Sequence, residues 1–126
     1  MHTESHTAGD DLVIDRQTIR ELREEGEGLL SELVEMFIDE VPGQLATLEE
    51  ALAKGDVGAT RLTAHTLKGT GGNFGASRMA ALAFAIEEKG RRGSLEGAAT
   101  AFAQLRTECA RVRVALEGAL TAGAGG

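Results

Sequence analysis

The chain has 126 residues, a net charge of −7 and a pI of about 4.9, and 42% of its residues are hydrophobic. This length is sufficient for one domain with its own core. The negative charge argues against nucleic acid as a partner, because that binding depends on neutralising phosphates with Lys and Arg, and it argues equally against an anionic membrane surface. No apolar run approaches the roughly 20 residues needed to span a bilayer. The N-terminus is polar and acidic, so we do not expect it to be a signal peptide, and we expect a cytoplasmic protein.

The N-terminal region is expected to begin with a tail and a short helix. Residues 1–10 are polar and acidic, which favours disorder. Asp15 is a plausible N-cap for the first helix, and Gly26 or Gly28 is expected to end it.

A longer helical stretch follows from residue 29 to residue 54. Its apolar residues recur at intervals of three and four, which is the period of a helix. Pro42 interrupts this pattern and predicts a kink, or a break between two helices, near Val41. Gly55 is expected to end the stretch.

The next helix is the one that carries His65. Asp56 is its expected N-cap, and the helix should run to about Gly72 or Phe74.

Two further helices complete the chain. Ser77 should open the first, which Gly90 and Gly93 end, and Ser94 should cap the second. Cys109 falls on the apolar seam of that last helix, which favours a small core residue.

Together these elements predict an all-α fold. There is no strand pattern, and the short connections favour antiparallel neighbours. We expect an antiparallel, up-and-down four-helix bundle with a short extra N-terminal helix. The domain should span residues 11–122 and be followed by a second tail at residues 123–126. No seam for an oligomer is apparent, so we expect a monomer.

The helix around His65 has an unusual exposed face. At about 100° per residue, Arg61, Lys68, Gly69 and Gly72 all lie within about 60° of His65. The two cations flank the imidazole, and the glycines leave the neighbouring surface bare at a cost of roughly 1 kcal/mol each to the helix. Another protein can therefore press closely against His65.

Several kinds of chemistry do not suit this face. A metal needs further ligands, and the face supplies only cations, so we expect no metal site. A hydrolase triad needs a nucleophile and an orienting acid, and no Asp or Glu lies one turn from His65 on this face.

A neutral imidazole is a nucleophile near pH 7. A phosphoryl group on His65 would have its oxygens neutralised by Lys68 and Arg61. The alternative is an exposed histidine beside a tight helix crossing, and Gly71, which points inward, fits that alternative.

The stretch AHTLKGTGGNFGA, residues 64–76, resembles the signature of the histidine-containing phosphotransfer (HPt) domain of two-component phosphorelays. The signature combines Ala64 and His65 with Leu67, Lys68 and Gly69, followed by small residues, an apolar residue and a glycine. The resemblance extends over roughly residues 12–118, including the proline-containing segment and the Gly-Asp pair before the histidine helix.

The resemblance implies a four-helix bundle and a specific reaction. His65 would accept a phosphoryl group from the aspartyl phosphate of a response-regulator receiver domain and pass it to another receiver domain. A hybrid sensor kinase would stand upstream. Lys68 matches the lysine that contacts the phosphoryl group and Gly69 the glycine that keeps the site open, whereas Arg61 rests on the helical periodicity alone.

The resemblance also implies a carrier rather than an enzyme. The chain would need no cofactor of its own, because the partner receiver domain would bring Mg²⁺ and the acidic residues. The alternative function is an adaptor of the same shape that binds a receiver domain or another protein without carrying phosphate. Leu62, about 60° from His65 on the helix, is a candidate docking contact, and the edge of the core is an equally good interpretation.

Overall fold

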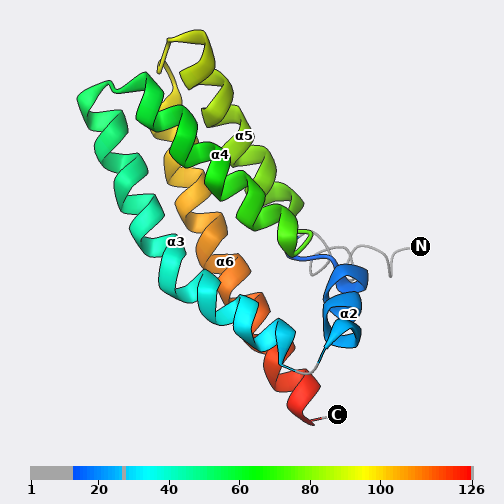
Figure 1. Ribbon diagram of the computed structural model, residues 1–126. Coiled ribbons are helices and arrows are strands. Elements are labelled where there is room, and N and C mark those ends of the chain that lie inside the picture. The colour runs from blue at the N-terminus through cyan, green and yellow to red at the C-terminus, as the bar shows by residue number, and fades with distance from the viewer. Residues whose placement is uncertain (1–12, 27, 126) are drawn as a thin grey trace.

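The computed structural model describes residues 13–26 and 28–125, with side chains as far as residue 121. All regular structure in these residues is α-helical, in five helices: α2 (Arg16–Glu25), α3 (Leu29–Lys54), α4 (Val57–Asn73), α5 (Ser77–Arg92) and α6 (Ala98–Gly125). The four long helices α3 to α6 lie side by side in alternating directions, and α2 lies beside one end of them (Figure 1). No helix in this part of the chain is long and apolar enough to cross a membrane.

The four long helices surround one hydrophobic core. Both α3 and α5 pack against α4 and against α6, so each long helix has two neighbours. Leu48, Leu67, Ile86 and Leu105 are completely buried between them, as the helical period of the sequence predicts. Cys109 is also buried, which confirms that it is a core residue.

The N-terminal end of α2 is attached to the turn between α4 and α5. The Asp15 carboxylate accepts hydrogen bonds from the Thr18 backbone N–H at 2.9 Å and from the Thr18 hydroxyl at 2.7 Å, which confirms the predicted cap and lowers the pKa of Asp15. The Asp15 backbone N–H donates to the Phe74 carbonyl. Gly75 has a φ of +66°, and a side chain there would collide with Asp15. Glycine is therefore required at this junction.

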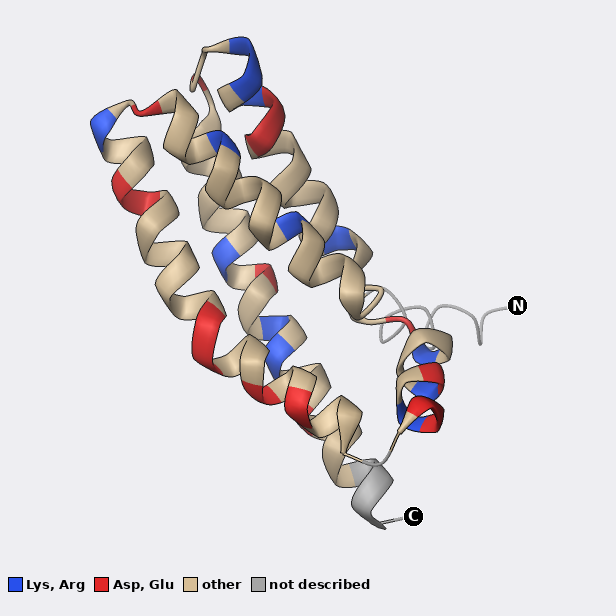
Figure 2. Ribbon diagram, in the orientation of Figure 1, with Lys and Arg blue, Asp and Glu red and all other residues tan. Residues whose placement is uncertain are grey.

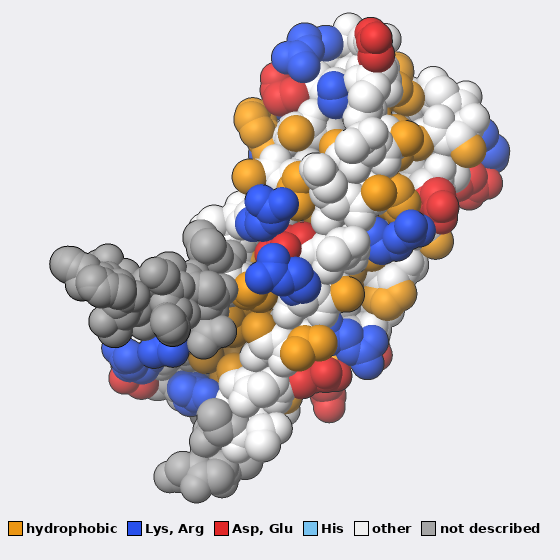
Figure 3. Space-filling model, turned by 180° about the vertical axis from the view of Figure 1, so that it is seen from behind, with side chains coloured by type: hydrophobic (Ala, Val, Ile, Leu, Met, Phe, Trp, Pro, Cys, Tyr) orange, Lys and Arg blue, Asp and Glu red, His pale blue; other side chains and the backbone are white. Residues whose placement is uncertain are grey.

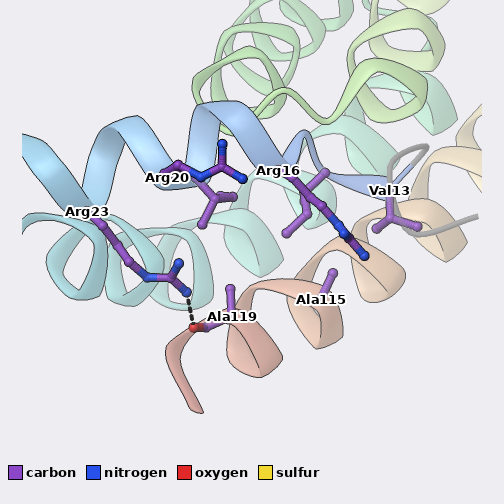
Figure 4. Close-up of a pocket in the computed structure, with 8 residues that line it drawn as sticks. Val13, Arg16, Arg20, Arg23, Ala115 and Ala119 are labelled. Atoms are coloured by element: carbon purple, nitrogen blue, oxygen red, sulfur yellow. Dashed lines mark hydrogen bonds between the residues drawn. The ribbon is translucent and has the colours of Figure 1, made fainter. Parts of the chain in front are cut away.

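The other end of α2 is attached to α6. The Arg23 guanidinium donates a 2.6 Å hydrogen bond to the Ala119 carbonyl, and Figure 4 shows Arg16, Arg20 and Arg23 along the edge of the groove between the two helices. A cation near the C-terminal part of a helix also interacts favourably with its dipole. These contacts fix α2 to the main body of the molecule.

Of the two alternatives predicted near Val41, a kink or a break between two helices, the break is wrong. Helix α3 runs without interruption through Pro42, and Figure 1 shows its ribbon changing direction part-way along. Phe37 and Val41 before the proline and Leu48 after it are all buried. Because both halves of the helix pack on the same core, a bend at the proline is less costly than a break.

Two other helix ends differ from expectation. Gly90 does not end α5 but is buried within it, and Gly93 alone forms the cap. Ser94 does not cap α6, which begins at Ala98. The Ser94 N–H instead donates to the Lys89 carbonyl and completes the end of α5, a common way of satisfying the last carbonyls of a helix.

The two predicted tails have different outcomes. Residues 1–10 lie outside the described residues. At the other end, α6 continues to Gly125, three residues into the stretch 123–126 that the sequence predicts as a tail. Extending an existing helix adds one hydrogen bond per residue without a new nucleation step, so the chain does not stop being helical at residue 122.

Candidate functional site

The contact between the histidine helix α4 and α5 is the most extensive contact between any two helices in the described structure. Glycines lie at two points of this contact. A Cβ atom on Gly71 would approach Met79 Cγ to 3.1 Å, and one on Gly90 would approach the Val57 carbonyl oxygen to 2.9 Å. The two backbones therefore come close together on both sides of His65. Gly71 is a packing glycine, as the alternative interpretation of the sequence predicts.

The glycines on the other face of α4 have a different environment. A Cβ atom on Gly69 or Gly72 would meet nothing within 4 Å, and the His65 side chain is 61% exposed. Leu67 and Phe74, on the opposite face, are buried. The sequence therefore correctly predicted an imidazole in the open, with bare surface beside it.

A buried carboxylate from α5 lies beneath the imidazole. Glu87 is only 3% exposed, and its Oε2 atom lies 2.9 Å from Nδ1 of His65. Its Oε1 atom lies 2.9 Å from Nζ of Lys68, and the Arg91 guanidinium reaches Oε2 at 3.3 Å. One acid thus joins three basic side chains from two helices. The search for an acid within α4 missed it, because Glu87 is 22 residues away along the chain.

The sequence does contain a signal for Glu87. On α5 the buried residues include Ala83, Ile86 and Gly90, and Glu87 lies among them on the face that packs against the bundle. A charged residue is seldom buried unless it is paired. An acid on an apolar stripe therefore indicates that basic partners come from a neighbouring helix.

The protonation of this cluster follows from Glu87. Burial raises the pKa of the Glu87 carboxyl, but the contacts with Lys68 and His65 outweigh burial and lower it. The carboxylate is therefore ionised near neutral pH, and an ionised carboxylate only accepts hydrogen bonds. Nδ1 of His65 then carries a proton, so in the neutral form of the imidazole the lone pair is on Nε2. Within the described residues, no group hydrogen-bonds to Nε2.

The two cations predicted beside His65 lie in different places. Lys68 joins the cluster through Glu87, and its ammonium also lies over the ring of Phe84. Arg61 is exposed on the preceding turn, and no ion pair or hydrogen bond links it to His65 or Glu87 among the residues described. Arg91, which the sequence did not suggest, is the second cation of the cluster.

Leu62 is a solvent-exposed residue and not part of the core edge. Its exposed fraction is 60%, and it lines a shallow hollow between α3 and α4 together with Glu40, Gln44 and Thr66. Helix α3 carries six acidic residues and one basic one, and Figure 2 shows red along much of its length. A surface that approaches His65 from this side meets an exposed leucine and a negatively charged helix.

Comparison with known families agrees with this geometry. Residues 32–115 match the model of the Hpt domain. The chain belongs to the Hpt domain family. Among curated proteins, none matches the sequence.

A solved structure resembles the chain over most of its length. It is the crystal structure of histidine-containing phosphotransfer protein B (HptB) from Pseudomonas aeruginosa PAO1, with 33% sequence identity and a TM-score of 0.78. The similarity covers 83% of this chain and 91% of that one. The arrangement of helices described above is therefore that of a solved Hpt protein.

The Hpt domain match begins within α3 and ends within α6. It includes His65, Lys68 and Glu87, so the whole cluster lies inside the family domain. Helix α2 lies outside the match, and its contacts are with the ends of the long helices. The cluster around Glu87 is thus built entirely from the family part of the chain.

Proposed function

We propose that this Hpt protein carries a phosphoryl group on His65, which it accepts from the aspartyl phosphate of a receiver domain and passes to another receiver domain. Histidine phosphotransfer in phosphorelays is the activity of the family to which the chain belongs. The observation that carries the assignment to His65 is the 2.9 Å contact between Nδ1 and the buried Glu87 carboxylate, because it leaves Nε2 as a free nucleophile.

The reaction follows from this protonation state. The Nε2 lone pair attacks the phosphorus atom, an N–P bond forms, and the P–O bond to the receiver aspartate breaks. The electron pair of that bond stays on the aspartate, which leaves as a carboxylate. The imidazole becomes a cation that keeps its Nδ1 proton, and the Glu87 carboxylate neutralises that charge at 2.9 Å. The same steps in reverse deliver the group to the next receiver domain.

Lys68 supplies the charge that the phosphoryl oxygens need. Phosphoryl transfer depends mainly on positioning and on neutralising negative charge. Lys68 lies one turn from His65, and its ammonium is already at the site through Glu87. Arg61, on the preceding turn of the same face, adds positive charge at longer range.

The open surface lets the partner bring the rest of the machinery. Gly69 and Gly72 leave room for the receiver active site, and Leu62 provides an apolar contact next to it. Replacing Gly69 with Leu should block docking without unfolding the protein, because nothing lies within 4 Å of the added Cβ. Binding of a receiver domain measured by calorimetry should be lost in Gly69→Leu and retained in Gly69→Ala, and equal binding by both variants would contradict the proposal.

The proposal also covers the role of the partners, the extent of the domain and its oligomeric state. The protein is a carrier and not an enzyme: a receiver domain contributes Mg²⁺ and its acidic residues, and a hybrid sensor kinase provides the phosphate upstream. The carrier domain spans residues 11–122, as an antiparallel four-helix bundle with α2 as an extra helix. We propose that it works as a cytoplasmic monomer.

A transfer assay tests the proposal. The full chain is incubated with a panel of phosphorylated receiver domains, and the product is analysed for acid-labile, base-stable phosphate and mapped by mass spectrometry. We expect phosphate on His65 and none on His65→Gln. Receiver binding without phosphate transfer from any donor would instead support the adaptor.

A further inference from the structure

Phe84 places a large aromatic ring at the edge of the site. Its exposed fraction is 46%, and the Lys68 ammonium nitrogen lies 5.1 Å from the centroid of the ring. The negative face of an aromatic ring attracts a cation at this distance. Lys68 therefore has two partners, the ring of Phe84 and, at 2.9 Å, the carboxylate of Glu87.

The antiparallel helices bring these partners to Lys68 together. Lys68 lies one turn after His65 on α4, and Phe84 lies one turn before Glu87 on α5. On its own helix, Phe84 follows the small residues Ala80 and Ala81, which offer the ring little surface to pack against. The ring thus contributes less to the core than to the surroundings of Lys68.

The two partners of Lys68 have different effects on its ammonium group. A carboxylate engages one N–H donor of the ammonium directly, and Glu87 does so here at 2.9 Å. An aromatic ring attracts the charge as a whole without requiring a directed N–H donor. An ammonium has three donors, so one that rests on the ring retains donors for phosphoryl oxygens.

We propose that Phe84 is a positioning residue that holds the Lys68 ammonium at the mouth of the site, ready to contact the phosphoryl group on His65. This inference rests on the proposed function of His65. Removing the aromatic face should slow phosphoryl transfer about two- to fivefold, the factor that corresponds to a cation–π contact at an exposed site. Docking of the receiver domain should not change.

The experiment compares two variants of the full chain at Phe84 with a control variant elsewhere on the surface. Phe84→Tyr retains the aromatic face, Phe84→Leu retains an apolar side chain, and Val114→Ala, at a 68% exposed position on α6, controls for the loss of surface apolar area. Three quantities are measured for each: the single-turnover transfer rate at saturating phosphorylated receiver, the Kd for the unphosphorylated receiver, and the NMR shift of the Lys68 Hε protons.

We expect Phe84→Leu to lower the saturated rate, to leave Kd unchanged and to remove the ring-current shift of Lys68, while Phe84→Tyr and Val114→Ala resemble the parent protein. In a Lys68→Gln background, Phe84→Leu should have no further effect on the rate. A change in Kd alone would make Phe84 a docking contact and overturn the inference, as would an equal loss of rate in the Lys68→Gln background. Failure of the parent protein to accept phosphate would overturn the proposed function itself, whereas transfer that is insensitive to Phe84→Leu overturns only the role of Phe84.

Discussion

Two glutamates are buried among the described residues, and only one of them belongs to the site proposed for phosphoryl transfer. Glu87 on α5 is 3% exposed and Glu108 on α6 is 2% exposed. Glu87 contacts His65, Lys68 and Arg91, whereas Glu108 contacts Arg78 at 3.5 Å and Arg111 at 3.0 Å. The face seen in Figure 3 carries basic side chains close to acidic atoms.

The difference lies in the chemistry of the partners. Removing a carboxylate from water is costly, and basic partners compensate for the cost at both positions. An arginine remains protonated in proteins, so the Glu108 cluster has no group that can act as a nucleophile. An imidazole has a second nitrogen, and fixing the proton on Nδ1 leaves that nitrogen reactive. A buried acid thus indicates a functional site only when one of its partners keeps a reactive atom, as the second nitrogen of an imidazole does.

The surroundings of Glu108 support a purely structural role. Cys109, the next residue, is buried, and burial together with the Glu108 charge raises the pKa of its thiol to about 12. A thiol with that pKa remains protonated and unreactive near neutral pH. This stretch of α6 therefore combines a buried charged residue and a buried cysteine without forming a reactive site.

The largest expected effect is from removing the reactive imidazole. His65→Gln should abolish phosphate acceptance, because no other side chain on this face is a nucleophile of the same kind. Stability should change by no more than about 0.5 kcal/mol, since the side chain is 61% exposed and a Gln amide can still donate to Glu87. Transfer assays and thermal unfolding measure the two effects. A large fall in Tm would show that His65 supports the fold rather than the reaction.

The comparison of the two acids is tested directly by the same substitution at each. Glu87→Gln should lower the transfer rate by between about tenfold and about a thousandfold, because a neutral amide no longer enforces the Nδ1–H tautomer. Glu108→Gln should leave the rate unchanged. Each should cost about 1 kcal/mol of stability, since the basic partners of both acids are between about a third and two thirds exposed and can turn to water.

These paired variants are matched in burial and in the substitution itself. Single-turnover transfer and urea unfolding, measured for both, separate reaction from fold. Equal losses of rate at the two positions would mean that Glu87 acts through stability alone, and the distinction between the two clusters would disappear.

Removing a basic partner of each buried glutamate should give a smaller difference in transfer rate between the two clusters. Lys68→Ala should slow transfer about tenfold, which corresponds to about 1.4 kcal/mol of transition-state stabilisation, whereas Arg111→Ala, which removes a partner of Glu108, should not slow it. Rapid-quench kinetics with a saturating phosphorylated receiver measures the rates. Lys68→Arg serves as the control that restores the charge, and a loss of rate in Arg111→Ala would contradict the separation of the two sites.

The features that depend on one helix could be predicted from the sequence. The exposure of His65, the presence of Lys68 on the same face and the open space at Gly69 all follow from a period of 3.6 residues. The caps at Asp15 and Asp56 are local and were also correct.

The features that depend on two helices could not be predicted. Glu87, Arg91 and Phe84 reach the site only because α4 and α5 pack in a particular register, with close approach at Gly71 and Gly90. A single sequence gives each helix its faces but not the alignment of one helix against another. The two wrong expectations have a similar cause. Packing on both sides of Pro42 keeps α3 continuous where a break was one alternative, and Ser94 is engaged by the preceding helix instead of capping α6.

The smallest expected effect is a difference between the parent protein and Glu87→Gln in how their stability falls at acid pH. The pKa of Glu87 in the folded protein lies below its ordinary value of 4.5, with burial opposed and outweighed by Lys68 and His65. A lowered pKa means that the unfolded chain binds the proton more readily, so this contribution to stability is present above about pH 4.5 and is lost as the pH falls through the folded-state pKa. The free energy of unfolding of the parent protein should therefore fall more steeply below pH 4.5 than that of Glu87→Gln. Urea titrations between pH 3 and pH 7 measure the two curves, and parallel curves would mean that the contacts of Glu87 with Lys68 and His65 do not favour its ionised form in solution. Since the ionised form is what keeps the proton on Nδ1 of His65, the same result would also remove the reason for a reactive Nε2.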